Sequence, residues 1–276
     1  MNQTSQANEY DALIKKIQRK RIAVIILTII AIVITTTICS PIQIEILDET
    51  IIDYKGINPV ITVLLVVLIF FIELIAYALV SSPLTTSMDV ECDPEKYLIL
   101  NKALNKQKNK NHIYAVALIY MGHFEEALDY ANKMIACNKT GMILAGLFNK
   151  ARCEFFLGDF DSLKVTVKQY ESTLNDFKEA NQKTKDVYNK ILKTMNLLIA
   201  ISEEDKDGIS DYSSIEVWKN SKATEGYVNY LKGIVAYMTE NKEEAIYRFM
   251  YVKDNCPKTV LSAKSQQYLL KLSTDI

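Results

Sequence analysis

The side chains that most often carry chemistry are sparse in this chain of 276 residues, which has two histidines and five cysteines. His112 and His123 have no cysteine or serine near them in a known catalytic pattern. The cysteines form no C-x-x-C pair and stand at no metal-ligand spacing from a histidine. We interpret them as small buried residues; they are Cys39, Cys92, Cys137, Cys153 and Cys256.

Acidic clusters offer no better candidate for catalysis or metal binding. Glu203–Asp205 and the nearby Asp207 resemble a calcium loop only superficially, because the twelve-residue order of ligands is missing. Glu125–Glu126 and Glu243–Glu244 recur at the same place in two segments, where carboxylates at a helix start favour the helix dipole. The sequence therefore predicts no catalytic residue, no cofactor site and no metal site, and a protein that is not an enzyme.

Glu73 is different, because it lies inside one of two long apolar runs. Residues 22–40 carry no charge, and residues 58–80 carry Glu73 alone. A helix over the first run would span about 28 Å, close to the thickness of a bilayer core. The two runs predict a transmembrane hairpin over residues 22–80, with an external loop at 41–57. Glu73 is then a candidate for a polar contact with another membrane subunit, unless it is simply protonated or hydrogen-bonded near the helix end.

A cleaved signal peptide is a poor interpretation of the first run. Its apolar core is too long, and the TTTICS sequence at its end lacks a small-x-small cleavage site. Lipid attachment at Cys39 is also poorly supported, because Ile38 stands where a small residue is usual. We expect both helices in the mature protein.

The distribution of Lys and Arg predicts the orientation of the hairpin. Residues 1–21 carry five such side chains, the loop carries one, and residues 81–112 carry five. Basic residues favour the cytoplasmic side, so we expect a multi-pass protein of the cell membrane with both termini in the cytoplasm. The alternating IQIEI and TIIDYK segments of the loop could pair as a small β-hairpin. Richness in Lys, Ile, Asn and Tyr favours a bacterial source with an AT-rich genome.

The sequence pattern after the hairpin predicts one helical domain. Residues 81–94 contain two prolines and few large apolar side chains, which predicts a linker. Asp93 and Pro94 are suited to the cap and first turn of a helix. From residue 95 to residue 276 helical periodicity continues, so the fold class is all-α. Residues 81–276 hold 26 basic and 26 acidic side chains, and this balance argues against a nucleic-acid partner.

Three segments of this domain share one pattern, an apolar helix, a short turn and a second, amphipathic helix. The turn glycines Gly122 and Gly158 lie 36 residues apart, whereas the third segment has Lys242 in place of a turn aromatic. The recurring positions are Gly122, Phe124, Ala127 and Ala131, then Gly158, Phe160, Leu163 and Val167, then Gly233, Ala245, Phe249 and Pro257. The small residues that would let paired helices approach are Ala115, Ala151 and Gly233.

These segments resemble tetratricopeptide repeats over most of residues 95–276. The resemblance implies an α-solenoid, in which each helical hairpin buries one face against its neighbours. Residues 183–201 would form the long helix of a degenerate fourth hairpin whose second helix is short, and residues 262–272 a capping helix. A different helical-hairpin repeat is the alternative.

The resemblance also implies that the first helices line a concave groove that binds a partner. The groove candidates are Tyr120, Phe148, Arg152, Phe155, Tyr227, Tyr230 and Tyr237, and packing in the core is the alternative for each. Arg152 offers a planar fork suited to carboxylates, with an internal salt bridge to Glu154, Asp159 or a neighbouring hairpin as the alternative. Family members that clamp a terminal carboxylate use Lys and Asn where this chain has His112 and Val116, so that chaperone-type activity is not implied.

Two functions are consistent with these features. The first is a membrane-anchored scaffold or adaptor, which presents a cytoplasmic groove to a peptide or protein partner. The second is a structural subunit of a membrane complex for transport, secretion or envelope assembly, which would act through the hairpin in the lipid bilayer and through Glu73.

Overall fold

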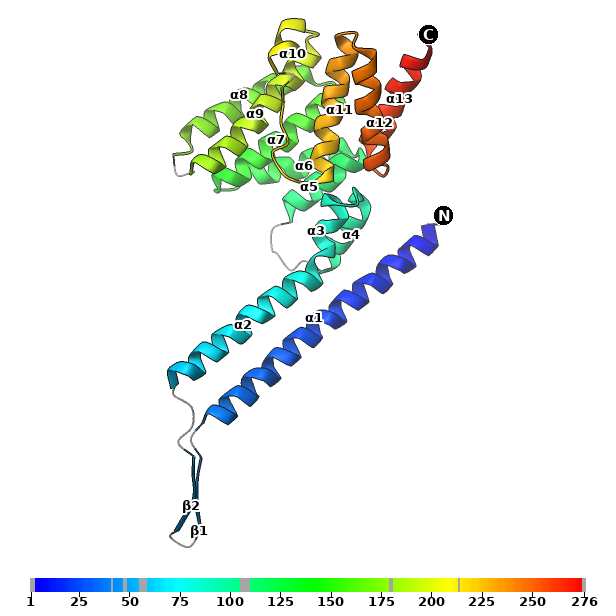
Figure 1. The fold of residues 1–276 in the computed structure, drawn as a ribbon. Coiled ribbons are helices and arrows are strands. Elements are labelled where there is room, and N and C mark those ends of the chain that lie inside the picture. Colours follow the sequence, from blue (N-terminus) through cyan, green and yellow to red (C-terminus); the bar gives the residue numbers. More distant parts are fainter. Residues whose placement is uncertain are drawn as a thin grey trace. The chain divides into compact units, whose positions relative to one another are not determined.

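The chain divides into two compact units, Met1–Pro83 and Leu84–Ile276. The computed structural model describes residues 3–40, 42–46, 49–54, 59–104, 110–178, 181–212 and 214–274. Two long helices and a pair of strands make up the described part of the first unit, and helices make up that of the second (Figure 1).

The first unit is a helical hairpin. Helices α1 (Gln3–Cys39) and α2 (Pro59–Ser81) lie side by side and run in opposite directions (Figure 1). Two segments, Asn8–Cys39 and Val60–Ser81, are long and apolar enough to cross a membrane. Helix α1 begins well before residue 22, the expected start, because residues 3–21 contain no proline or glycine that would end it.

One polar contact joins the two helices where the basic tail meets the apolar run. The Nε and Nη2 atoms of Arg21 donate to the Ser81 hydroxyl at 3.0 and 2.8 Å. The guanidinium also lies 5.0 Å from the centre of the Tyr77 ring. This end of the hairpin is therefore held by both a hydrogen bond and a cation–π contact.

Two strands lie between α1 and α2, so the chain is not wholly α-helical. Strands β1 (Ile42–Ile46) and β2 (Glu49–Tyr54) pair antiparallel, with Ile44 opposite Ile52. Their register shifts between Ile44 and Glu45. The remaining residues of the expected loop, 41, 47–48 and 55–57, lie outside the described part of the chain.

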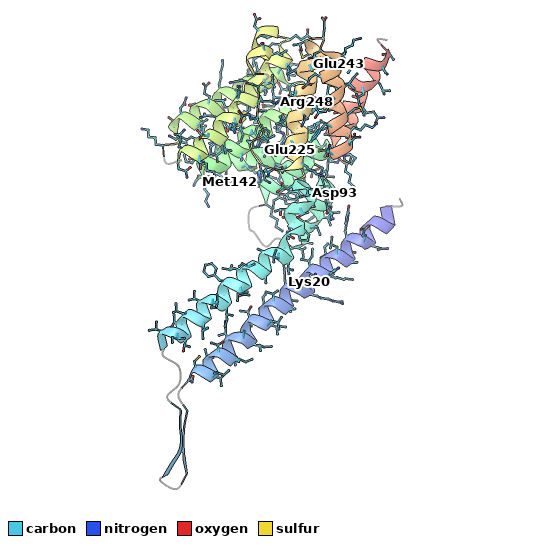
Figure 2. The ribbon with its side chains drawn as sticks, viewed as in Figure 1. Lys20, Asp93, Met142, Glu225, Glu243 and Arg248 are labelled. Carbon is cyan, nitrogen blue, oxygen red and sulfur yellow. The ribbon has the colours of Figure 1, made fainter. Side chains whose placement is uncertain are left out.

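The expected linker at residues 81–94 is largely helical and packed. Helix α3 (Pro83–Asp89) buries Leu84 and Met88, and helix α4 (Pro94–Leu104) follows after a short bend. The prolines that suggested a break both stand at the first position of a helix, where proline is tolerated. Asp93 caps α4 by accepting the backbone N–H three residues on, at 3.0 Å (Figure 2).

The rest of the described part of the second unit is mostly helical. They are α5 (Asn111–Met121), α6 (Phe124–Ile135), α7 (Thr140–Leu157), α8 (Phe160–Asp176), α9 (Gln182–Ser202), α10 (Lys206–Tyr212), α11 (Lys222–Met238), α12 (Lys242–Asn255) and α13 (Val260–Thr274). Gly122 and Gly158 follow α5 and α7 with φ of +86° and +77°, a left-handed conformation that favours glycine. Helices α9, α10 and α13 cover the long, short and final helices expected from the sequence.

Consecutive helices pack closely where their facing residues are small. A Cβ atom added to Gly146 of α7 would lie 2.9 Å from the backbone oxygen of Ala131 in α6. One added to Gly233 of α11 would lie 2.7 Å from the ring of Phe249 in α12. Ala127, on α6, is fully buried. Larger side chains at these places would push the paired helices apart.

Helix α11 also packs against helices that are distant in sequence. The Tyr120 hydroxyl of α5 donates to the backbone oxygen of Ala223 in α11 at 2.9 Å. The Phe148 ring of α7 meets the Tyr227 ring of α11 edge-on, with centroids 6.5 Å apart. Aromatic side chains of α5, α7 and α11 therefore share one core, on the face where an open groove was expected.

Candidate ligand pocket

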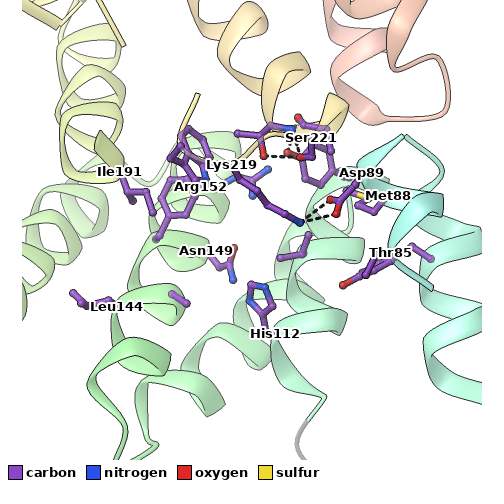
Figure 3. A pocket seen from close by; sticks show the side chains of 18 of the residues that line it. Thr85, Met88, Asp89, His112, Leu144, Asn149, Arg152, Ile191, Lys219 and Ser221 are labelled. Atoms are coloured by element: carbon purple, nitrogen blue, oxygen red, sulfur yellow. Dashed lines mark hydrogen bonds and ion pairs between the residues drawn. The ribbon is translucent and has the colours of Figure 1, made fainter. Parts of the chain in front are cut away.

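A cavity of about 190 Å³ lies among helices α3, α5, α7, α9 and the segment that leads into α11 (Figure 3). Its apolar walls include Met88, Leu144, Phe148, Ile191 and Trp218. Its polar side chains include Asp89, His112, Asn149, Arg152, Lys219 and Ser221. Apolar walls with a few convergent polar groups are the usual composition of a small-ligand site.

Arg152 is the most deeply buried charged residue of this pocket, with 3% of its surface exposed. Its guanidinium carbon lies 4.4 Å from the centroid of Tyr227, 4.7 Å from Tyr120 and 5.5 Å from Phe148. The Nε and Nη2 atoms are buried and have no hydrogen-bond partner among the residues that the structure describes. Three aromatic rings therefore surround the guanidinium, and its Nε and Nη2 atoms are available to donate to a ligand.

The position of Arg152 follows from the burial of α7. Its neighbours Ala151 and Cys153 are both fully inaccessible, so the helix is covered on several faces here. The internal salt bridges considered from the sequence are not formed. The Glu154 carboxylate instead accepts from the Thr166 hydroxyl at 3.1 Å, and Asp159 caps α8.

A second cation of the pocket, Lys219, is already paired. The Lys219 ammonium lies 2.7 Å from the Asp89 carboxylate of α3, and Figure 3 shows the lysine extending across the cavity to reach it. Beside them, the Ser221 hydroxyl caps α11 and lies 2.9 Å from the Thr224 hydroxyl. Asp89 therefore balances the charge of Lys219, and the positive charge of Arg152 is left uncompensated.

His112 lines the pocket from the first turn of α5 and keeps part of its surface exposed. Desolvation by the surrounding protein lowers the pKa of its imidazole below the usual value, and the charges of Lys219 and Arg152 lower it further. The lowered pKa favours the neutral imidazole at pH 7.

Two tyrosines beside Arg152, Tyr120 of the pocket lining and Tyr227 behind the guanidinium, are neutral hydroxyl groups. Burial raises the pKa of Tyr120 to about 12, even though the nearby Arg152 opposes the shift. Burial likewise raises the pKa of Tyr227. Its hydroxyl is buried, and no described residue lies in hydrogen-bond geometry to it. Both groups remain protonated at physiological pH and do not neutralise the arginine.

The seven groove candidates separate into two groups. Tyr120, Phe148 and Arg152 line the pocket, and Tyr227 packs against the arginine. Tyr230 is buried elsewhere, between Phe156 and Phe249. The remaining two, Phe155 and Tyr237, are partly buried against the core. An exposed groove formed by all seven is therefore not what the structure contains, because the rings of α11 occupy that face.

Sequence reasoning missed several pocket residues. Asp89 was assigned to a linker, and Trp218 and Lys219 follow a short helix whose repeat register was undetermined. The one available signal was Trp218, the single tryptophan of the chain, in a segment with few other large apolar residues. His112, for which the sequence showed no catalytic pattern, lines the pocket.

Glu73 contributes to a second cavity, within the helical hairpin. This cavity, of about 280 Å³, is lined by Val24, Thr28 and Ala31 of α1 and by Ile69, Glu73 and Ala76 of α2, among others. Thr28 is largely buried, and its hydroxyl donates to the Val24 carbonyl at 3.0 Å. It is the one hydroxyl among these lining residues.

Among the described residues, no group of three or more His, Cys, Asp or Glu side chains is arranged to hold a metal ion. No protein-family model, curated protein or solved structure matches the chain.

Proposed function

We propose that this protein is a membrane-anchored adaptor whose helical domain binds a carboxylate group of a peptide or protein partner. The pocket around Arg152 is the site of binding. The single observation that carries this proposal is a buried guanidinium with two unpartnered donors in a mostly apolar cavity. A buried charge without a counterion is costly, and a bound anion would remove that cost.

The charge and size of the pocket favour a singly charged group. Lys219 is paired with Asp89, so one positive charge is left for a ligand. A carboxylate carries one negative charge and matches the arginine fork in shape, whereas a phosphate dianion would bring excess charge close to Asp89. The apolar walls favour a carboxylate attached to an apolar side chain.

The repeat architecture and the topology belong to the same proposal. Glycine turns after α5 and α7, and small residues between paired helices, support a tetratricopeptide-like solenoid in which α11 narrows the groove to a pocket. The bias of Lys and Arg supports cytoplasmic termini, so that the hairpin anchors the domain at the inner face of the membrane. The partner would then be a cytoplasmic protein or peptide.

Trp218 provides a direct test, because it is the single tryptophan and meets Phe148 edge-on with centroids 5.2 Å apart. We expect benzoate to change the tryptophan emission of detergent-solubilised full-length protein saturably, and neutral benzamide to have little effect. Arg152→Met should abolish the benzoate response, whereas Arg248→Met should retain it. An equal response to benzamide, or an unchanged response in Arg152→Met, would reject carboxylate recognition.

The source of the carboxylate can be separated with two peptides. One ends in a free carboxylate, and the other has an amidated C-terminus and an internal glutamate. Preferential binding of the first would assign the pocket to a chain terminus, and preferential binding of the second to an acidic side chain. A peptide that carries neither group is the control.

A second candidate function is supported by the cavity within the hairpin. Glu73 lines a space whose other lining residues are apolar except for Thr28, and an ionisable residue at this depth commonly meets a polar partner. In this proposal the hairpin is a subunit of a membrane complex. Glu73→Gln should then reduce co-purification of a membrane partner while the benzoate response of Trp218 is preserved. Unchanged co-purification in Glu73→Gln would reject a role for the carboxylate.

A further inference from the structure

Two cysteines that are 164 residues apart in the sequence meet in the core of the helical domain. The sulfur atoms of Cys92 and Cys256 lie 3.0 Å apart, and both side chains are fully buried. Cys92 stands between α3 and α4, and Cys256 follows α12 directly. Each is a free thiol.

The surrounding residues make specific room for this pair. A Cβ atom added to Gly226 of α11 would lie 2.4 Å from the Cys256 sulfur, so the thiol occupies the space that glycine leaves. The Cys256 thiol also lies 3.5 Å from the carbonyl oxygen of Lys222. Cys92 adopts a positive φ of +49°, which non-glycine residues seldom adopt.

A second contact joins the same two segments next to the thiols. The ammonium of Lys258 forms an ion pair with the buried carboxylate of Asp93, the residue after Cys92. The bend before α4 and the turn after α12 are therefore held together at adjacent positions. A covalent bond between the sulfurs would require a closure of about 1 Å from their present separation, given the usual S–S length.

We propose that Cys92 and Cys256 form a reversible disulfide when the protein meets a hydroperoxide, and that this bond fastens the α3–α4 bend to the α11–α12 hairpin. Hydrogen peroxide is close to water in size and so suits a buried site. The inference does not depend on the ligand of the Arg152 pocket.

The chemistry proceeds in two balanced steps. The Cys256 thiolate attacks one oxygen of the peroxide, so an S–O bond forms, the O–O bond breaks, and hydroxide leaves to take up a proton as water. Cys92 then attacks the sulfenic sulfur, so the S–S bond forms, the S–O bond breaks, and a second water leaves with the Cys92 proton. Two thiols lose two electrons, and one peroxide is reduced to two waters.

Cys256 is the better first nucleophile of the two. A hydrogen bond from the Cys92 thiol lowers the pKa of Cys256, and the nearby Lys222 ammonium lowers it further, whereas burial opposes both. The thiolate is the reactive form, so this environment favours attack from Cys256.

Cys153 is a matched control, because it is equally buried but has no second thiol beside it. Burial raises its pKa to about 12, which leaves little thiolate. The test uses full-length protein with Cys39→Ser and Cys137→Ser, so that the pair and Cys153 are the cysteines that remain. Hydrogen peroxide is added, free thiols are alkylated, and the protein is analysed by peptide mapping and intact mass spectrometry.

We expect a peptide cross-linked between Cys92 and Cys256, the loss of two hydrogen atoms in mass, full reversal by dithiothreitol, and an alkylated Cys153. The oxidised protein should melt roughly 5–15 °C higher, because the bond closes a long loop of the unfolded chain. Peptide mapping of wild-type protein gives the same test if the variant folds poorly. Sulfinic acid at either cysteine without a cross-link, oxidation of Cys153 to the same extent, or no oxidation of the pair would overturn the proposal.

Discussion

Arg152 is a charged side chain in a place where an apolar one would pack. We expect Arg152→Met to raise the free energy of unfolding by about 1–3 kcal/mol, because it removes an unpaired buried charge and keeps a similar volume. Loss of the three ring contacts opposes this by up to about 2 kcal/mol. Urea unfolding of the full-length protein in detergent measures the difference.

Arg248→Met is the matched control for this prediction. Arg248 donates to Glu244 and to Asn229, each at 2.7 Å, and it is only partly buried (Figure 2). Its replacement should leave stability unchanged or lower it slightly. A clear loss of stability in Arg152→Met would instead show that the guanidinium is held in place for packing, and the binding proposal would lose its main support.

The lowered pKa of His112 predicts that both the stability of the fold and the binding of a carboxylate depend on pH. Its pKa in the folded protein is lowered, so the unfolded chain binds more protons when pH falls below about 6.5, and stability decreases in that range. A bound carboxylate would offset the positive field that lowers this pKa. Affinity for benzoate should therefore increase by roughly 2–5-fold as pH falls from about 7.5 to about 5.5, since ligand and proton favour each other. His112→Asn should remove this dependence, and a persistent effect in that variant would assign it to another group.

For single residues, the sequence identified Arg152 at the centre of the pocket but not the residues that surround it. Arg152 was conspicuous because its neighbours in the helix are apolar, and that pattern is local. The resemblance to tetratricopeptide repeats placed Tyr230 in the same groove, yet it packs between Phe156 and Phe249. The difference depends on which helices meet across the fold, and no local pattern contains that information.

The helices were predictable because their ends are marked chemically. Asp93 and Pro94 begin α4, and Gly122 and Gly158 end α5 and α7. The packing of α11 against α5 and α7 was not predictable, because it depends on contacts such as that of Tyr120 with Ala223, which are 103 residues apart. The prolines of residues 81–94 were misread as a linker signal, since proline also begins helices.

The two turn glycines should respond differently to substitution. A Cβ on Gly158 would meet nothing within 4 Å, so its positive φ is the constraint and not the space around it. Gly158→Ala should cost about 1–2 kcal/mol through backbone strain. Gly122→Ala should cost more, because its Cβ would also lie 3.0 Å from Val260 Cγ2. Thermal melting measures both.

Asparagine provides the control at the open turn, because it tolerates the left-handed conformation better than alanine. Gly158→Asn should recover part of the stability lost in Gly158→Ala. Equal melting temperatures for the two variants would mean that backbone strain is not the source of the loss.

For the whole molecule, composition and charge predicted two units, an apolar hairpin and a neutral helical domain. The strand pair β1–β2 changes the all-α assignment only between the two long apolar helices, α1 and α2. Its alternating residues had suggested such a hairpin, although a pair of this length is marginal by itself. Which side of the membrane each unit faces depends on the basic residues that flank the apolar runs.

That orientation can be tested with a membrane-impermeant thiol reagent, because Cys137 is the one native cysteine that is not buried. It should be labelled only after cells are permeabilised, and a cysteine introduced at Asn8, which is exposed, should behave in the same way. A cysteine that replaces Glu49 in β2, between the two membrane helices, should be labelled in intact cells. Labelling of Cys137 from outside would reverse the topology. It would then place the Cys92–Cys256 pair in a compartment where disulfides persist, so that this bond would be a permanent structural link and not a reversible one.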